Sequence, residues 1–221
     1  KELHKFLLDH GYTIDEVMGS SLINMYGKCG DIGGAKDVFD NIKEQATVVS
    51  WTSMIRVYVE HEQGEKALQL FSQMIAEKTH LIPDAVTFIT ILAACANQSS
   101  LDDGKCVHAC ILECGLDSVI DVSNAIVNMY GKCGGVEDAE RMFDNMSECD
   151  SVSWNVLLSV YNLHGRTTQL VNKMLSRGCM PDIITWTSWL TSCAEESDLI
   201  EGKKVHTSVI NSGHTIDTVV T

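Results

Sequence analysis

Threonine and asparagine side chains that could hydrogen-bond to a ligand recur in one setting along this sequence. Thr52, Asn155 and Thr187 each directly follow a tryptophan, and an aspartate comes about thirty residues later. An asparagine amide donates and accepts, a threonine hydroxyl is shorter and does both, and an aspartate only accepts. Such side chains could match the edge of a pyrimidine or, beside the shorter threonine, a purine. The alternative is that they are ordinary polar residues on a solvated helix face.

Metal and catalytic chemistry have weaker support. Cys106, Cys110 and Cys114 are spaced at one helical face with His108 nearby, so a zinc site is conceivable, but no second ligand pair with Cys-x-x-Cys spacing exists. A phosphate-binding Gly-Lys-Ser/Thr loop and the zinc-deaminase signature are both absent. His108 and His206 are expected to pack or cap helices. We therefore expect no metal, no cofactor and no enzymatic activity.

The chain is internally repetitive. A set of short stretches recurs about a hundred residues later, as Met25–Gly30 in Met129–Gly134, Val49–Trp51 in Val152–Trp154, Pro83–Asp84 in Pro181–Asp182, and Gly104–His108 in Gly202–His206. Each long period holds three shorter units.

The shorter units carry paired helical patterns. Trp51, Met54, Ile55 and Tyr58 have the spacing of one buried helix face, and the stretch from Trp154 to Tyr161 repeats it. Second helices are predicted by a shared pattern of a small, an aliphatic, an aromatic and a second aliphatic residue: Ala35, Val38, Phe39, Ile42; Ala67, Leu70, Phe71, Met74; and Ala139, Met142, Phe143, Met146. Gly30 and Gly134 are expected to end first helices in the left-handed conformation.

These patterns predict an all-α fold, a right-handed α-solenoid of tandem helix-turn-helix repeats whose first helices line a concave face. A single helix pair could not bury its apolar face, so stacked pairs must share one elongated core. The apolar runs are too short to span a bilayer. The nine cysteines, several at equivalent positions, are expected to be small buried hydrophobes rather than disulfides.

The whole chain resembles the pentatricopeptide repeat (PPR) proteins of plant organelles, in particular the PLS class, in which three motif types alternate. The markers are Met-Tyr-Gly-Lys-Cys-Gly, Val-Ser-Trp, Pro-Asp and Gly-Lys-x-Val-His. The resemblance implies about six motifs plus partial ends. The expected divisions are 1–15 (end of a long-type motif), 16–47 (short-type), 48–84 (standard), 85–119 (long-type), 120–150 (short-type), 151–182 (standard), 183–217 (long-type) and 218–221 (start of the next motif).

Two stretches depart from the family pattern. Gly165 and Met174 lie closer together than Gly134 and Met146, which predicts that the second helix of motif 151–182 lacks nearly a turn, together with its alanine and phenylalanine. Two extra residues in 77–81 are expected to lengthen a turn.

The resemblance further implies recognition of single-stranded RNA, with two side chains per motif selecting one base. The pairs are Ser20 with Thr47, Thr52 with Asp84, Ile89 with Val119, Asn124 with Asp150, Asn155 with Asp182, and Thr187 with Asp217. In the family, threonine with aspartate favours G and asparagine with aspartate favours U over C. Ile89 with Val119 should be nearly silent and Ser20 with Thr47 has no clear reading, so the expected footprint is 5′-?-G-?-U-U-(G)-3′, its last base weak.

Apolar residues near the start of each motif could sandwich the bases: Val17, Val49, Val86, Val152 and Ile184. Asp121 stands at that place in the fourth motif and would be a poor wedge. The formal net charge of −14 argues against a general polyanion binder. We therefore expect affinity to come from stacking and base-edge hydrogen bonds, with weak binding by a short array and a shallow salt dependence.

The expected role is RNA recognition in a chloroplast or mitochondrion, in C-to-U editing-site recognition or another processing step, with editing-complex proteins as further partners and no membrane. The alternative is a protein-interaction scaffold, tetratricopeptide-like or attached to a ribosomal or editing complex, which the acidic balance favours. The sequence begins and ends inside the repeat pattern, so we expect it to be part of a longer array.

Overall fold

The computed structural model describes residues 15–76, 81–195 and 197–211, and all structural statements below concern these ranges. They form twelve α-helices and one short 3-10 helix, η1 (Lys43–Gln45). The expectations for 1–14, for the extra residues of 77–80, and for Asp217 and 218–221 lie outside the described residues. The predicted all-α class and the arrangement in paired helices are confirmed.

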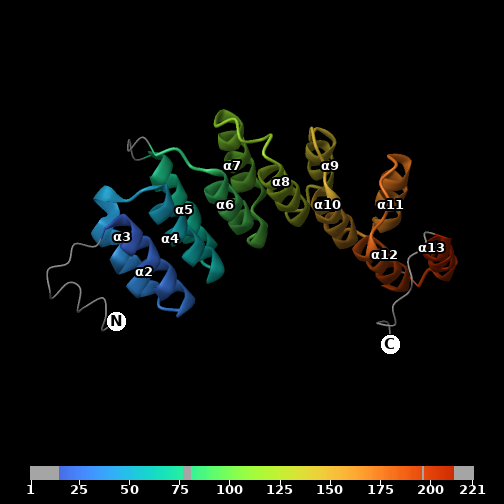
Figure 1. Ribbon diagram of the computed structural model, residues 1–221, viewed down its shortest axis with the longest axis horizontal. Coiled ribbons are helices and arrows are strands. Elements are labelled where there is room, and N and C mark those ends of the chain that lie inside the picture. The colour runs from blue at the N-terminus through green and yellow to red at the C-terminus, as the bar shows by residue number, and fades with distance from the viewer. Residues whose placement is uncertain (1–14, 77–80, 196, 212–221) are drawn as a thin grey trace.

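The first helix of each pair is always the same length. All six have 13 residues: α2 (Glu16–Lys28), α4 (Val48–Glu60), α6 (Ala85–Asn97), α8 (Ile120–Lys132), α10 (Ser151–Leu163) and α12 (Ile183–Glu195). Each contacts the next first helix along the chain. Together they form one continuous layer along the inner side of a curved molecule (Figure 1).

The second helices vary in length and form the outer layer. They are α3 (Ile32–Ile42), α5 (Gly64–Ala76), α7 (Leu101–Glu113), α9 (Val136–Asp144), α11 (Thr167–Ser176) and α13 (Leu199–Asn211). From α3 to α11, each packs on its own first helix and on the first helix of the following pair. The predicted solenoid with a concave face lined by first helices is confirmed, while its right-handed sense stays a prediction.

The turn inside each pair has one recurring geometry. The first helix ends at a residue with positive φ, and the residue after it donates its N–H to a carbonyl five positions back, as in a Schellman motif. The positive-φ residues are Gly30, Glu62, Ser99, Gly134, Gly165 and Ser197. In the pair α8–α9, for example, Gly135 N donates to Tyr130 O at 2.8 Å. The predicted left-handed ends at Gly30 and Gly134 are confirmed, and three turns achieve the same geometry without glycine.

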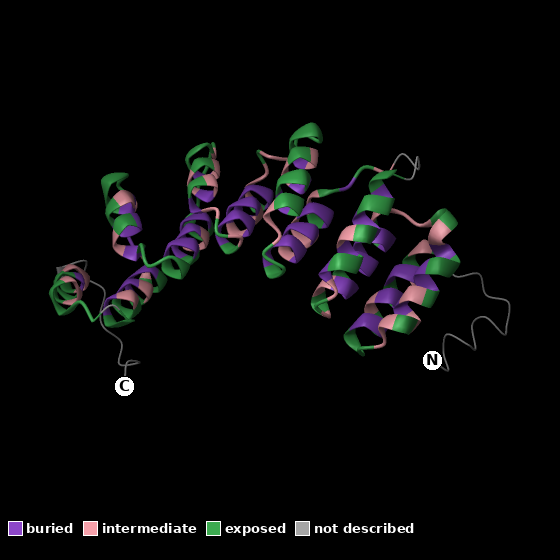
Figure 2. Cartoon of the chain, turned by 180° about the vertical axis from the view of Figure 1, so that it is seen from behind, coloured by how far each residue is buried: buried purple, intermediate pink, exposed green. Residues whose placement is uncertain are grey.

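The buried residues gather along the first helices and where the two layers meet (Figure 2). The predicted faces are confirmed: Trp51, Met54, Ile55 and Tyr58 are all buried, as are their counterparts Trp154, Leu157, Leu158 and Tyr161. Burial of these large apolar side chains is the main source of stability in such a stack.

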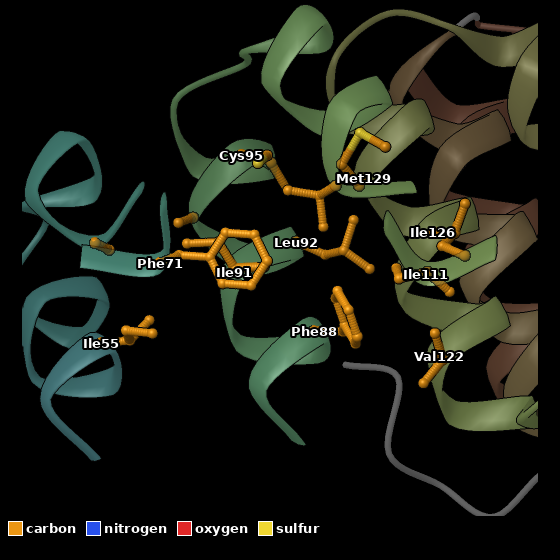
Figure 3. Packing of buried hydrophobic residues seen from close by; sticks show 14 of the residues in the cluster. Ile55, Phe71, Phe88, Ile91, Leu92, Cys95, Ile111, Val122, Ile126 and Met129 are labelled. Carbon is orange, nitrogen blue, oxygen red and sulfur yellow. The ribbon is translucent and has the colours of Figure 1, made fainter. Parts of the chain in front are cut away.

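An aromatic contact joins successive pairs. The phenylalanine of a second helix meets an aromatic residue of the next first helix edge to face, with ring centroids 5.0 Å apart for Phe39 and Trp51, 5.9 Å for Phe71 and Phe88, and 4.7 Å for Phe143 and Trp154. Figure 3 shows the middle contact, with Phe71, Phe88, Ile91 and Leu92 in one cluster. This geometry is favourable for aromatic pairs, and it makes the core continuous across the pair boundaries.

The second helix in 151–182, α11, has 10 residues against 13 in α5 of the other standard motif, as predicted, but it is not shorter than α9 of the preceding pair. Helix α11 has 10 residues and α9 has 9, and each begins two positions after a left-handed glycine. Leu170 therefore stands in the place of Ala139, and Met174 in that of Phe143. The alanine and phenylalanine are missing as expected, but buried Leu170, Val171 and Met174 fill the space.

Ionic contacts also connect these two outer helices. Nζ of Lys173 and Nη2 of Arg177 each lie 2.9 Å from Oδ1 of Asp144, and Nη1 of Arg166 lies 3.7 Å from Oε1 of Glu137. Partial burial alone would raise the pKa of Asp144, but its two cationic partners lower it. In this contact α9 thus contributes the acidic side chains, and α11 with its flanking residues contributes the basic ones.

Candidate nucleic-acid interface

The described aspartates among the predicted motif-closing residues, Asp84, Asp150 and Asp182, act as N-caps of the next first helix. Oδ1 of Asp84 accepts the backbone N–H of Thr87 at 2.8 Å and its hydroxyl at 2.8 Å. The equivalent residues repeat both contacts, with Asp150 capping at Ser153 and Asp182 at Thr185. One carboxylate oxygen therefore serves the helix end, and the other is free of the cap.

The cap hydrogen bonds also fix the charge of two of these aspartates. The backbone N–H of Ser153 is the main cause that lowers the pKa of Asp150. At Asp182, partial burial alone would raise the pKa, but hydrogen bonds from Thr185 and Asn155 lower it. Both groups are carboxylates at neutral pH and can only accept hydrogen bonds.

The structure directly joins one of the predicted base-selecting pairs. Nδ2 of Asn155 lies 3.5 Å from Oδ2 of Asp182, the oxygen that does not cap α12. Thr52 is connected to Asp84 through a third residue, because its Oγ1 lies 2.6 Å from Oγ1 of Thr87. The apolar pair Ile89 and Val119 is half-buried.

The first member of each predicted base-selecting pair is the fifth residue of its first helix, and we call its place a slot. The slot residues differ in their exposure to solvent. Thr187 is exposed and lines an open cavity of about 670 Å³ together with Lys132, Ser159 and Asn162 from neighbouring first helices. Asn155 is half-buried. Ser20, Thr52 and Asn124 are only 7%, 5% and 7% exposed, because consecutive first helices pack closely at their N-terminal turns. Only a small part of each of these three side chains is therefore accessible to a ligand.

Asn124 has an unusual hydrogen-bonding state. Its Oδ1 is buried and has no hydrogen-bond partner within the part of the chain that the structure describes. A buried acceptor without a donor costs about 1–3 kcal/mol. An N–H group of a ligand would relieve this cost.

The predicted sandwiching residues are all exposed despite being aliphatic. Val17 is 74% exposed, Val49 55%, Val86 47%, Val152 54% and Ile184 52%. Each is the second residue of its first helix, so the five side chains recur at one position along the inner layer. Asp121, also exposed, takes this place in α8. Scattered exposed aliphatics are common, but these five recur at one helical position, which chance exposure does not require.

Two features of the site were missed by sequence reasoning. Glu16 occupies the slot of the undecoded pair: Thr47 Oγ1 donates to its carboxylate at 2.5 Å, and Ser20 Oγ donates to its carbonyl at 2.9 Å. The second feature is a buried hydroxyl at the third position of four first helices, contributed by Ser50, Thr87, Ser153 and Thr185. The recurrence of serine or threonine there was a visible signal.

The cysteine and histidine expectations had mixed outcomes. Cys95 and Cys193 are buried, but Cys29, Cys106, Cys114 and Cys149 are exposed, so the prediction of buried small hydrophobes is wrong for these four. Burial raises the pKa of the Cys95 thiol to about 12. His108 accepts or donates a 2.9 Å hydrogen bond at the hydroxyl of Tyr130 and is half-buried, consistent with a packing role.

Other site classes find no support in the described ranges. No group of three or more His, Cys, Asp or Glu residues there could hold a metal ion. Among the same residues, no helix has the length and apolar character needed to cross a bilayer.

Comparison with known proteins agrees with this geometry. The PPR repeat family matches residues 46–97, and the PPR repeat matches 20–45 and 122–151. The chain is 38% identical over 208 residues to the Arabidopsis thaliana pentatricopeptide repeat-containing protein CRR2, chloroplastic, covering 93% of this chain and 32% of that protein. It is 36% identical over 223 residues to the Arabidopsis protein At4g39530, covering 100% and 26%. The chain thus spans a third or less of the length of these relatives.

A solved structure shares the fold. The crystal structure of the pentatricopeptide repeat protein PPR10 in complex with an 18-nt psaJ RNA element matches with a TM-score of 0.69 and 18% identity, covering 99% of this chain and 37% of that one. Paired helices, repeat spacing and these matches define a helical-repeat solenoid. The chain is a pentatricopeptide repeat protein with plant relatives. This repeat family is non-catalytic.

Proposed function

We propose that this chain binds single-stranded RNA, with one base per repeat at the N-terminal ends of the first helices. The observation that carries the proposal is the row of exposed aliphatic side chains at the second position of five first helices. These side chains alternate along the array with the polar slot residues at the fifth position. Aliphatic walls and a polar floor suit a base, whose faces are apolar and whose edge is polar.

The two asparagine slots favour uracil. The amide nitrogen of Asn155 is directed to Asp182, which leaves its Oδ1 as the group that meets a base. Oδ1 of Asn124 is a buried acceptor in need of a donor. Uracil presents an N–H at N3, whereas cytosine presents an acceptor there. Both slots thus support the U assigned by the family pattern.

The remaining slots give the footprint 5′-?-G-?-U-U-(G)-3′. Thr52 with Asp84 is assigned G, and Thr187 with Asp217 is assigned a weaker G. Ile89 and Val119 offer no hydrogen bond from their side chains and are assigned no preference. The Ser20 slot stays unassigned because Glu16 fills part of it.

The names of the relatives support a proposal for the biological setting. CRR2 and At1g11290 are named as chloroplastic proteins, and PPR10 is named in complex with an RNA element. We place this chain in a chloroplast or mitochondrion, in an array of the PLS class with the motif divisions given above, acting in RNA processing such as C-to-U editing-site recognition. Editing-complex proteins are its proposed protein partners.

The decisive experiment compares short single-stranded RNAs by fluorescence anisotropy with the 221-residue chain. One RNA carries G-x-U-U in the expected register, and matched RNAs replace G by A or each U by C. We expect tighter binding of the first RNA, by about fivefold per replaced base, the worth of one hydrogen bond. Equal binding of all the RNAs would contradict base reading.

The net charge of −14 favours a second candidate, a protein-interaction scaffold. A scaffold would use the exposed aliphatic row to bind a protein surface. It would bind none of these RNAs even at low salt, and replacing Val49, Val86 and Val152 by serine would leave RNA binding at its background level.

A further inference from the structure

Thr87 lies where it can control what Thr52 presents to a base. Thr87 is the third residue of α6 and fully buried, while Thr52 is the fifth residue of the preceding first helix, α4. The hydroxyl oxygen of Thr87 lies 2.8 Å from Oδ1 of Asp84 and 2.6 Å from the hydroxyl oxygen of Thr52. These three side chains form one chain of hydrogen bonds.

The direction of that chain is determined by the carboxylate. A hydroxyl carries one proton, and a carboxylate carries none. If Thr87 gave its proton to Thr52, a lone pair of Thr87 would face the Asp84 oxygen at 2.8 Å without a proton between them. Thr87 therefore donates to Asp84, and Thr52 donates to Thr87.

We propose that Thr87 is a specificity-determining residue of the Thr52 slot, because it consumes the only proton of the Thr52 hydroxyl. Thr52 then offers a base lone pairs alone. Guanine, with N–H groups at N1 and N2, can donate to such an oxygen, whereas the N1 of adenine is itself an acceptor. Thr87 acts as a positioning residue through Thr52 and Asp84, in support of G over A.

The adjacent slot lacks this device. Its closing residue is Thr47, the N-cap of α4, whose side chain makes no capping hydrogen bond and instead donates to Glu16. The hydroxyl of Ser20 donates to the backbone carbonyl of Glu16 at 2.9 Å, and Oγ of Ser50 lies 3.2 Å from Oγ of Ser20. Ser50 occupies the same helical position as Thr87 but has no carboxylate cap beside it, so Ser50→Ala is a matched control for the loss of a buried hydroxyl.

The test rests on the proposed function and compares G and A at the base that meets Thr52. Thr87→Val keeps the side-chain shape and removes the acceptor, which frees the proton of Thr52. We expect the ratio of G to A affinities to fall about fivefold, the worth of one neutral hydrogen bond. Thr87→Ser and Ser50→Ala should keep the ratio of the unaltered chain. A merely structural defect would weaken both RNAs equally and leave the ratio unchanged.

The outcomes separate the two proposals. A clear G preference in the unaltered chain, together with a ratio in Thr87→Val within twofold of it, would overturn the role of Thr87 and leave base reading intact. No G preference in the unaltered chain would overturn the assignment of the slot and the role of Thr87 with it. Melting curves of all variants show which of them are folded, and Thr87→Ser provides a folded comparison that keeps the hydroxyl.

Discussion

Asn155 and Asp182 meet across the junction of two repeats, with Nδ2 of the amide 3.5 Å from Oδ2 of the carboxylate while Oδ1 caps helix α12. Each oxygen of Asp182 thus has its own partner, the helix end for Oδ1 and the amide of Asn155 for Oδ2. In the proposed function the second contact orients the amide that meets the base.

Asp182→Ser separates these two tasks. Serine is also a good N-cap, so the free energy of unfolding should change by less than about 0.5 kcal/mol, whereas the asparagine loses its partner. We expect the preference of this slot for U over C to fall about fivefold in anisotropy titrations. Asp15→Ser is the control, since Asp15 caps α2 through Met18 and belongs to none of the described slots. An unchanged U preference would refute the orienting role of Asp182.

Asn155→Thr should change the base that this slot prefers. Threonine is shorter than asparagine and recreates the Thr–Asp pair of the Thr52 slot, with Thr185 in the position of Thr87. We expect the preferred base to shift from U toward G, by about fivefold in relative affinity. The same RNAs titrated with Thr207→Ser, a change on an exposed position of the outer helix α13, should show no shift. A variant that still prefers U would show that the fifth position does not select the base.

Acid should destabilise the fold through the capping aspartates. The pKa values of Asp150 and Asp182 are lowered in the folded chain, so these groups contribute stability above the unfolded pKa of about 3.9, and the contribution is lost as the pH falls through the folded values. Urea unfolding between neutral pH and about pH 2.5 should show less loss below about pH 4 for Asp182→Ser than for the unaltered chain. If the free energy of unfolding fell equally with pH in the two proteins, the contribution of the Asp182 carboxylate to stability would be contradicted.

Two glycines three residues apart should respond differently to alanine. A Cβ on Gly131 would lie 2.1 Å from Cγ2 of Val160, whereas one on Gly134 meets nothing within 4 Å. Gly131→Ala should cost about 1–3 kcal/mol by overpacking. Gly134→Ala should cost about 1 kcal/mol through its positive φ alone. Val160→Ala should rescue the first variant and not the second, as measured by denaturant unfolding.

The ionic contacts between α9 and α11 should add a small, salt-sensitive term. Asp144 is 41% exposed and contacts both Lys173 and Arg177, so after screening by solvent Asp144→Asn should cost at most about 1 kcal/mol. The cost should shrink in about 1 M salt. Asp40→Asn, which removes an exposed pair with Lys36 inside one helix, is the control and should cost less. A cost that is independent of salt would indicate packing rather than charge.

Periodicity predicted the helical pairs and their buried faces well, because helix spacing is a local property that apolar residues such as Trp51 and Tyr58 report directly. The sequence predicted left-handed residues only at glycines. The positive φ angles of Glu62, Ser99 and Ser197 were not predicted, because nothing in these side chains indicates a left-handed conformation. The expected slot residues lie at one position of each first helix. Their burial, as at Thr52, and their contacts with Thr87 or Glu16 depend on how closely neighbouring helices pack, which a single sequence does not encode locally.

The six first helices have 13 residues each, whereas the second helices range from 9 to 13. Because first helices touch one another at every step, this inner layer of constant length sets an even interval between successive slots, even though the outer helices that also pack against it differ in length. Insertions and deletions in the outer helices can therefore leave the interval between successive slots unchanged. Such a protein can drift in length, repeat by repeat, and still keep step with the even spacing of a nucleotide chain.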